Sequence, residues 1–199
     1  MMPRWLFLGD SITVGMSESL GRSMLSLGQE SDIVAAVSLD VEGALVNRQF
    51  LGYLAKRPRA VVVALGTNPY GIGEAERFRS GIADLMRKIW TVTDVVGWIS
   101  PWAGPAHDQR QMDIRAWVPV RWADGLILGR GLERVGEDDV HFSTRAYEEL
   151  GRRVAEWSVR VVDPRVLTVP GNAGKVVSVL GLMTASSIPV APEIWRMLR

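Results

Sequence analysis

Residues 60–65 read Ala60-Val61-Val62-Val63-Ala64-Leu65. All of these side chains are apolar and the three valines are β-branched, so a strand formed here would be buried on both faces. Such strands are typical of the centre of a parallel sheet that helices cover on either side. This stretch therefore predicts an α/β protein built on a central parallel sheet.

Similar short apolar runs recur along the chain and mark the other strands of this sheet. We expect them at Trp5–Leu8, Ile33–Val37 and Val95–Ile99, with Gly125–Leu128 as a weaker fifth strand. Longer segments lie between these runs, as the crossover connections of a parallel sheet require.

Two of the longer segments have apolar residues at steps of three and four, which is the spacing of one face of an α-helix. They are Glu74–Trp90 and Ser143–Trp157. The second helix is expected to start behind a cap formed by Ser143 or Thr144, because a side-chain hydroxyl can accept a hydrogen bond from the N–H groups of the first turn.

The composition excludes several kinds of chemistry. The chain has 199 residues, no cysteine, two histidines and a formal net charge of +1. Without cysteine there is no disulfide, no zinc–thiolate site and no cysteine nucleophile, and two histidines argue against a multi-histidine metal site. The balanced charge gives no overall attraction to nucleic acid or to anionic membranes, although it leaves room for a local charged patch, and we expect no nucleic-acid partner.

No targeting or transmembrane segment is expected. The apolar run Trp5–Leu8 is shorter than the core of a signal peptide, which needs about 7–15 residues. Val176–Ala191 is interrupted by polar residues and falls short of the roughly 20 residues that span a bilayer. These observations leave the location open between the cytoplasm and a larger particle.

The pattern changes after Trp157. We expect residues 1–158 to form the catalytic domain, and residues 159–199 to form a C-terminal extension that does not continue the alternation of strands and helices. The extension either wraps back onto the same core or serves as a docking arm for a homo-oligomer or an assembly partner. The sequence leaves both interpretations open.

Three polar clusters lie next to the predicted strands and helices. They are Gly9-Asp10-Ser11 after the first strand, Gly66-Thr67-Asn68 after the third strand, and Asp138-Asp139-Val140-His141 before the last helix. Ligands of an open parallel sheet bind beyond the carboxyl ends of its strands. We therefore expect the three clusters to contribute to one site.

Ser11, His141 and Asp138 together have the chemistry of a nucleophilic catalyst. A serine hydroxyl is a weak nucleophile until a nearby base takes its proton, and histidine, with an ordinary pKa of about 6.5, is suited to that task. A carboxylate on the other ring nitrogen orients the imidazole, and one turn can present both Asp138 and His141. Asn68 offers an amide that can donate a hydrogen bond to an oxyanion.

The same residues also have interpretations without catalysis. Ser11 can cap the helix that follows it, and His141 can be an ordinary residue at a helix start. The other histidine, His107, is expected on a surface loop. Trp102 either packs in the core or lines a pocket for an acyl group or a sugar.

At these clusters the sequence resembles the SGNH hydrolases, also called the GDSL esterase and lipase family. The first, third and last sequence blocks of that family correspond here to Gly9-Asp10-Ser11, Gly66-Thr67-Asn68 and Asp138-Asp139-Val140-His141, in the family's order. The resemblance covers roughly Arg4–Trp157. It implies a three-layer, flavodoxin-like sandwich whose central parallel five-stranded sheet has the order 2-1-3-4-5.

The resemblance further implies a role for each matching residue. Ser11 would be the nucleophile, His141 the general base and Asp138 its orienting partner. The Ser11 backbone N–H and the Asn68 side chain would donate hydrogen bonds to the oxyanion. No metal and no organic cofactor is implied.

Two departures from the family pattern concern the oxyanion hole. The family's second block supplies a glycine N–H after the second strand, whereas here the nearest glycine is Gly43 and the residue that matches by position is Ser38. Both remain candidates. In the third block Pro69 takes the place of the usual aspartate, and proline lacks an N–H donor and stiffens the loop.

The sequence thus favours a serine esterase that hydrolyses a carboxylic ester through an acyl-serine intermediate. Its expected partner is a small-molecule or glycan ester, with a short acyl group or an acetylated sugar as candidates. The alternative is a structural or binding module on the same scaffold, for example in a phage tail or another large assembly, with minor or vestigial esterase activity.

Overall fold

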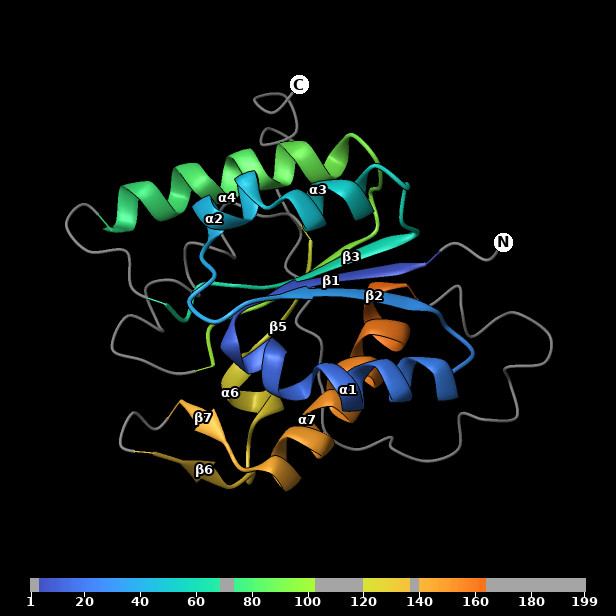
Figure 1. The fold of residues 1–199 in the computed structure, drawn as a ribbon, viewed down its shortest axis with the longest axis vertical. Coiled ribbons are helices and arrows are strands. Elements are labelled where there is room, and N and C mark those ends of the chain that lie inside the picture. Colours follow the sequence, from blue (N-terminus) through green and yellow to red (C-terminus); the bar gives the residue numbers. More distant parts are fainter. Residues whose placement is uncertain (1–3, 69–73, 103–119, 137–139, 164–199) are drawn as a thin grey trace.

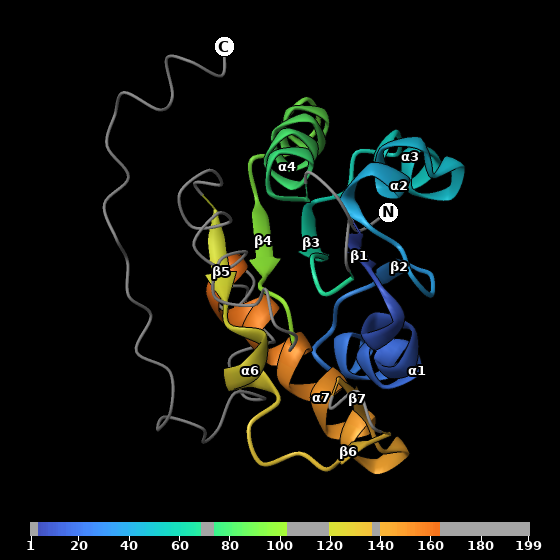
Figure 2. The ribbon, with the colours of Figure 1, turned by 90° about the vertical axis from the view of Figure 1, so that its left-hand side faces the viewer.

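A computed structural model describes residues 4–68, 74–102, 120–136 and 140–163 of the chain. Its centre is a parallel five-stranded sheet with the order β2-β1-β3-β4-β5, which confirms the expected order (Figure 2). The strands are β1 (Trp5–Gly9), β2 (Ser31–Ala35), β3 (Ala60–Ala64), β4 (Val96–Ile99) and β5 (Arg121–Ala123).

Helices cover both faces of the sheet and complete the three layers that the family resemblance implies (Figure 1). One face carries α1 (Ser11–Ser26), α6 (Gly125–Leu128) and α7 (Thr144–Trp157), and the other carries α2 (Val41–Val46), α3 (Arg48–Leu54) and α4 (Glu74–Trp90). The two expected long helices are confirmed as α4 and α7. Ser143 caps α7, because its Oγ accepts a hydrogen bond from the Ala146 N–H at 3.3 Å.

The centre of the sheet lies where the valine-rich stretch predicts it. Every residue of β1 and of β3 is buried, so both strands have apolar contacts on their two faces. β1 pairs with both neighbours in parallel register, and Gly9 is aligned with Ala35 of β2 and Ala64 of β3. The loops that follow these three strands therefore leave the sheet on the same side, at the carboxyl ends of the strands.

The prediction of a strand at Gly125–Leu128 is wrong. These residues form the short helix α6, and the fifth strand lies just before them at Arg121–Ala123. The Asp124 carboxylate caps the helix by accepting the Leu126 N–H at 2.8 Å. A Cβ at Gly125 would lie 2.5 Å from the Ser100 carbonyl oxygen, so glycine allows the helix to start close to β4. A short apolar run does not by itself separate a strand from a buried helical turn.

A small antiparallel pair was not expected from the sequence. It consists of β6 (Arg134–Val135) and β7 (His141–Phe142), and it lies beside α7 outside the main sheet (Figure 1). Each strand has two residues, which is too short for the alternation of apolar and polar side chains to be recognised.

Helix α7 passes directly into a π-helical turn, Ser158–Val162. Val159 and Val162 of this turn are buried in the core on the α1 and α7 face. Asp163 is almost fully buried and accepts a hydrogen bond from Arg59 at 2.6 Å. The first five residues of the expected C-terminal extension therefore pack on the sheet, whereas residues 164–199 lie outside the described part of the chain.

Among the described helices, none has both the length and the apolar composition needed to cross a membrane.

Candidate active site

Ser11 is the first residue of α1 and follows β1 after the single residue Asp10. Asp10 caps the helix, because its Oδ1 accepts the Ile12 N–H at 3.1 Å. The interpretation of Ser11 as the helix cap is therefore wrong. Gly9 is needed for this tight turn, since a Cβ there would lie 1.9 Å from Thr13 Oγ1.

Asp10 is a fully buried carboxyl group directly before the serine. Burial raises the pKa of Asp10 to about 6, against the smaller lowering effects of its hydrogen bonds, of which that from the Ile12 N–H is the largest. Within the described residues its second oxygen, Oδ2, has no hydrogen-bond partner. The ionised form of Asp10 is therefore less stable in the folded protein than in water.

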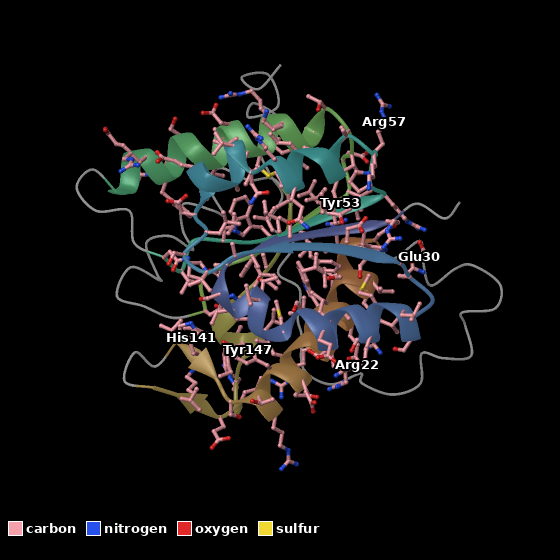
Figure 3. All side chains as sticks on the ribbon, viewed as in Figure 1. Arg22, Glu30, Tyr53, Arg57, His141 and Tyr147 are labelled. Carbon is pink, nitrogen blue, oxygen red and sulfur yellow. The ribbon has the colours of Figure 1, made fainter. Side chains whose placement is uncertain are left out.

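His141 lies in β7, far from Ser11 in sequence but next to it in space. Its Nε2 atom is 3.1 Å from Ser11 Oγ, which is hydrogen-bond distance. Figure 3 shows the His141 side chain near the end of α1 at which Ser11 begins the helix, with Tyr147 of α7 close by. The Tyr147 ring packs on Gly15, where an added Cβ would lie 2.4 Å from Tyr147 Cζ. Helix α7 therefore lies tightly against the first turns of α1.

Arg134 holds the strand pair that carries His141. Its Nη2 atom donates to the Trp102 carbonyl at 3.0 Å, and its Nη1 atom donates to the Val140 carbonyl at 3.4 Å. The guanidinium carbon also lies 4.6 Å from the ring centre of Phe142. Arg134 thus ties β6 and β7 to the segment after β4. No pattern in the sequence predicts this role, because the contact with Trp102 joins residues 32 positions apart in the chain.

Besides the Ser11 N–H, the predicted oxyanion donors lie between β2 and α2, in the first turn of α2, and in the loop after β3. The Asn68 side chain donates from Nδ2 to the Leu39 carbonyl at 3.0 Å, so it ties these two loops together. Gly43 belongs to the first turn of α2, where its N–H donates to Asp40 Oδ1 at 2.6 Å. Ser38 is exposed and has a φ of 60°, the left-handed conformation that glycine adopts most easily.

Trp102 does not line an open pocket. It is fully buried and packs edge to face on Phe142, with ring centres 6.5 Å apart. The interpretation of Trp102 as a core residue is therefore confirmed. Asp138, Pro69 and His107 lie outside the described residues.

The described residues also contain no group of three or more His, Asp and Glu side chains placed to hold a metal ion.

Solved structures with this fold include several enzymes. A carbohydrate esterase of family 3 from Talaromyces cellulolyticus is 17% identical, and the match covers 84% of this chain and 100% of that chain with a TM-score of 0.62. The psychrotrophic esterase EstA from Pseudoalteromonas is 15% identical, with 80% and 97% covered and a TM-score of 0.60.

A member of the lipolytic G-D-S-L family from Veillonella parvula is 15% identical, with 77% of this chain and 96% of that chain covered and a TM-score of 0.55. The sequence matches no protein-family model and no curated protein. The chain thus has the fold of the SGNH hydrolases, as its sequence blocks predict. At these identities the likeness concerns the fold.

Proposed function

We propose that this protein hydrolyses carboxylic esters through an acyl intermediate on Ser11. The observation that carries the proposal is the distance of 3.1 Å between His141 Nε2 and Ser11 Oγ. A base at hydrogen-bond distance is what a serine hydroxyl needs to act as a nucleophile near neutral pH. The fold supports the proposal, because solved structures that share it are named as esterases.

The reaction has two stages. In the first, Ser11 Oγ bonds to the ester carbonyl carbon while His141 takes the hydroxyl proton, and collapse of the tetrahedral intermediate breaks the bond to the alcohol, which leaves with that proton. In the second, a water molecule gives a proton to His141 and bonds to the acyl carbon. The acid is then released, and Ser11 regains its proton from His141.

The negative charge on the tetrahedral oxygen needs hydrogen-bond donors. The Ser11 N–H is one candidate, since the N–H groups of the first helical turn lack acceptors within the helix. The Asn68 amide is the second. For the donor after β2 we favour the Ser38 N–H over the Gly43 N–H, because the Asp40 carboxylate already accepts the hydrogen bond of Gly43.

Asp138 completes the proposed site as the carboxylate that orients His141. This role rests on the spacing of Asp138 and His141 in the sequence and on the resemblance to the family's last block. Esters of short acyl groups and acetylated sugars both fit the proposed reaction.

The test is the turnover of p-nitrophenyl esters by the intact protein and by Ser11→Ala. We expect the substitution to lower kcat/KM by about 10³-fold or more and to abolish labelling of the protein by a fluorophosphonate probe. Ser17→Ala is the matched control, because Ser17 lies on the same helix and its hydroxyl donates to the Val14 carbonyl at 2.9 Å. If Ser11→Ala turns over the esters as fast as the intact protein, or if the probe labels another residue, the proposal is refuted and the binding-module alternative is favoured.

A further inference from the structure

The described residues expose seven large apolar side chains to solvent. They are Val14, Leu25, Val37, Val46, Leu126, Ile127 and Val135. Single exposed apolar residues are common on protein surfaces and need no explanation. Three of these seven, however, lie next to the residues of the candidate active site. We call Val14, Val37 and Val135 the valine rim.

Val14 lies one helical turn after Ser11 on α1. Residues three apart share a face of a helix, and each Cα–Cβ bond leans toward the helix N-terminus. The Val14 side chain is therefore directed along the face of α1 that carries Ser11. It is 40% exposed, so the apolar surface next to the serine is open to a ligand.

Val135 lies directly opposite His141 in the β6–β7 pair. Opposite residues of an antiparallel pair have neighbouring side chains on the same face, with Cβ atoms roughly 5 Å apart. The other pair, Arg134 and Phe142, faces the protein interior, where Phe142 is buried. Val135 therefore shares the outer face with His141, and it is 43% exposed.

Val37 lies on the third side of the site, in the turn after β2. Gly9 and Ala35 are aligned at the ends of β1 and β2, and the Ala36 N–H donates to the Gly9 carbonyl at 3.3 Å. Val37 directly precedes Ser38 and is 73% exposed. At the carboxyl end of the sheet, Val14 thus lies beside Ser11, Val135 beside His141 and Val37 beside Ser38.

We propose that the valine rim binds the hydrocarbon chain of the acyl group, so that the preferred esters have acyl chains longer than acetyl. This inference rests on the proposed ester hydrolysis at Ser11. An ester whose carbonyl carbon lies at Ser11 Oγ can extend its acyl chain along the face of α1 that carries Val14, or past His141 toward Val135, which lies opposite His141 in the strand pair. Three valines offer no hydrogen bond to a sugar, but they gain free energy when a hydrocarbon chain covers them. β-branched side chains are also stiff, so the rim is formed before the ligand arrives.

The inference is tested with p-nitrophenyl acetate, butanoate and octanoate, each below its micelle concentration. The measured quantity is the ratio of kcat/KM for the octanoate to kcat/KM for the acetate. In the intact protein we expect this ratio to be well above one. Val14→Thr and Val135→Thr keep the shape of the side chain and replace a methyl group by a hydroxyl. Each should lower the ratio about fourfold, the factor that corresponds to about 0.8 kcal/mol per buried methylene-sized group.

Val46→Thr is the matched control, because Val46 is a valine at the end of α2 with 74% exposure and lies outside the rim. It should leave the ratio unchanged. The role of the rim would be overturned by a ratio near one in the intact protein, or by a ratio that is the same in Val14→Thr and Val135→Thr as in the control Val46→Thr. Either result would leave ester hydrolysis at Ser11 intact. Loss of activity on all three esters together with absent labelling of Ser11 would instead refute the proposed function, and with it the inference.

Discussion

Val162 occupies the space that a side chain on Gly97 would need. A Cβ at Gly97, in the middle of β4, would lie 2.5 Å from Val162 Cγ2 and 2.8 Å from Trp157 Cη2. Both side chains are buried, so neither can move away into solvent. The end of α7 and the π-helical turn can lie this close to the sheet because β4 carries no side chain at this position.

We therefore expect Gly97→Ala to destabilise the protein. Overpacking of a filled core lowers the free energy of unfolding by roughly 1–3 kcal/mol, and thermal unfolding followed by circular dichroism measures the effect. Gly52→Ala is the control, since a Cβ at Gly52 in α3 would meet no atom within 4 Å and alanine favours a helix over glycine. The double variant Gly97→Ala with Val162→Ala should regain part of the loss if the contact is the cause. A stability equal to that of the Gly52 variant would contradict the explanation.

Arg134 is expected to affect the reaction through the position of His141. Arg134→Met keeps an apolar stem over Phe142 but removes the hydrogen bonds to the Trp102 and Val140 carbonyls. A base displaced by about 1 Å can lower the rate up to 10²-fold, so we expect kcat to fall at least tenfold with a smaller change in KM. Steady-state kinetics test this, with the exposed Arg130→Gln as control. An unchanged kcat would show that His141 keeps its place without Arg134.

Asp10 is expected to make the stability of the protein depend on pH. Its pKa is raised from 3.8 to about 6 in the folded state, so the folded state binds this proton more tightly than the unfolded state does. The contribution of Asp10 to stability is therefore highest below about pH 4, falls as the pH rises toward 6 and stays low above it. This difference between the folded and unfolded pKa values of Asp10 corresponds to roughly 3 kcal/mol in the free energy of unfolding.

Asp10→Asn keeps an oxygen that can accept the Ile12 N–H but does not ionise. The free energy of unfolding of the variant minus that of the original protein should increase by roughly 2.5 kcal/mol between pH 4 and pH 8, because part of the full effect is already present at pH 4. Urea unfolding at the two pH values measures this difference, and the shared titration of all other groups cancels in it. A difference that stays the same at both pH values would show that Asp10 has no raised pKa in the folded protein.

The residues just after α7 are expected to contribute to the core. A chain that ends at Trp157 lacks the buried Val159 and Val162 and the ion pair between Asp163 and Arg59. A chain that ends at Asp163 keeps them. Burial of two valine side chains stabilises the folded state by roughly 3–6 kcal/mol. The shorter chain should therefore unfold at a clearly lower temperature or not fold. Equal melting temperatures would show that these residues do not stabilise the core.

Much of the fold was predictable, because a strand buried on both faces is apolar throughout. The run Ala60–Leu65 identified the centre of the sheet in this way, and the helical spacing in Glu74–Trp90 identified α4. The strand expected at Gly125–Leu128 is wrong, since four apolar residues fit a buried helical turn as well as a strand. The helix was decided by the Asp124 cap and by the close approach of Gly125 to the Ser100 carbonyl.

For the candidate site, the sequence by itself determined which chemical groups are present. With no cysteine and only two histidines, His141 and His107 are the two imidazole groups that can serve as a base near neutral pH, and the Gly-Asp-Ser block singled out Ser11. Only the tertiary structure decided that His141 Nε2 lies 3.1 Å from Ser11 Oγ and that Arg134 holds the strand pair that carries the histidine. These relationships depend on contacts between segments up to 130 residues apart, whereas sequence patterns report the conformation of neighbouring residues and the faces they bury.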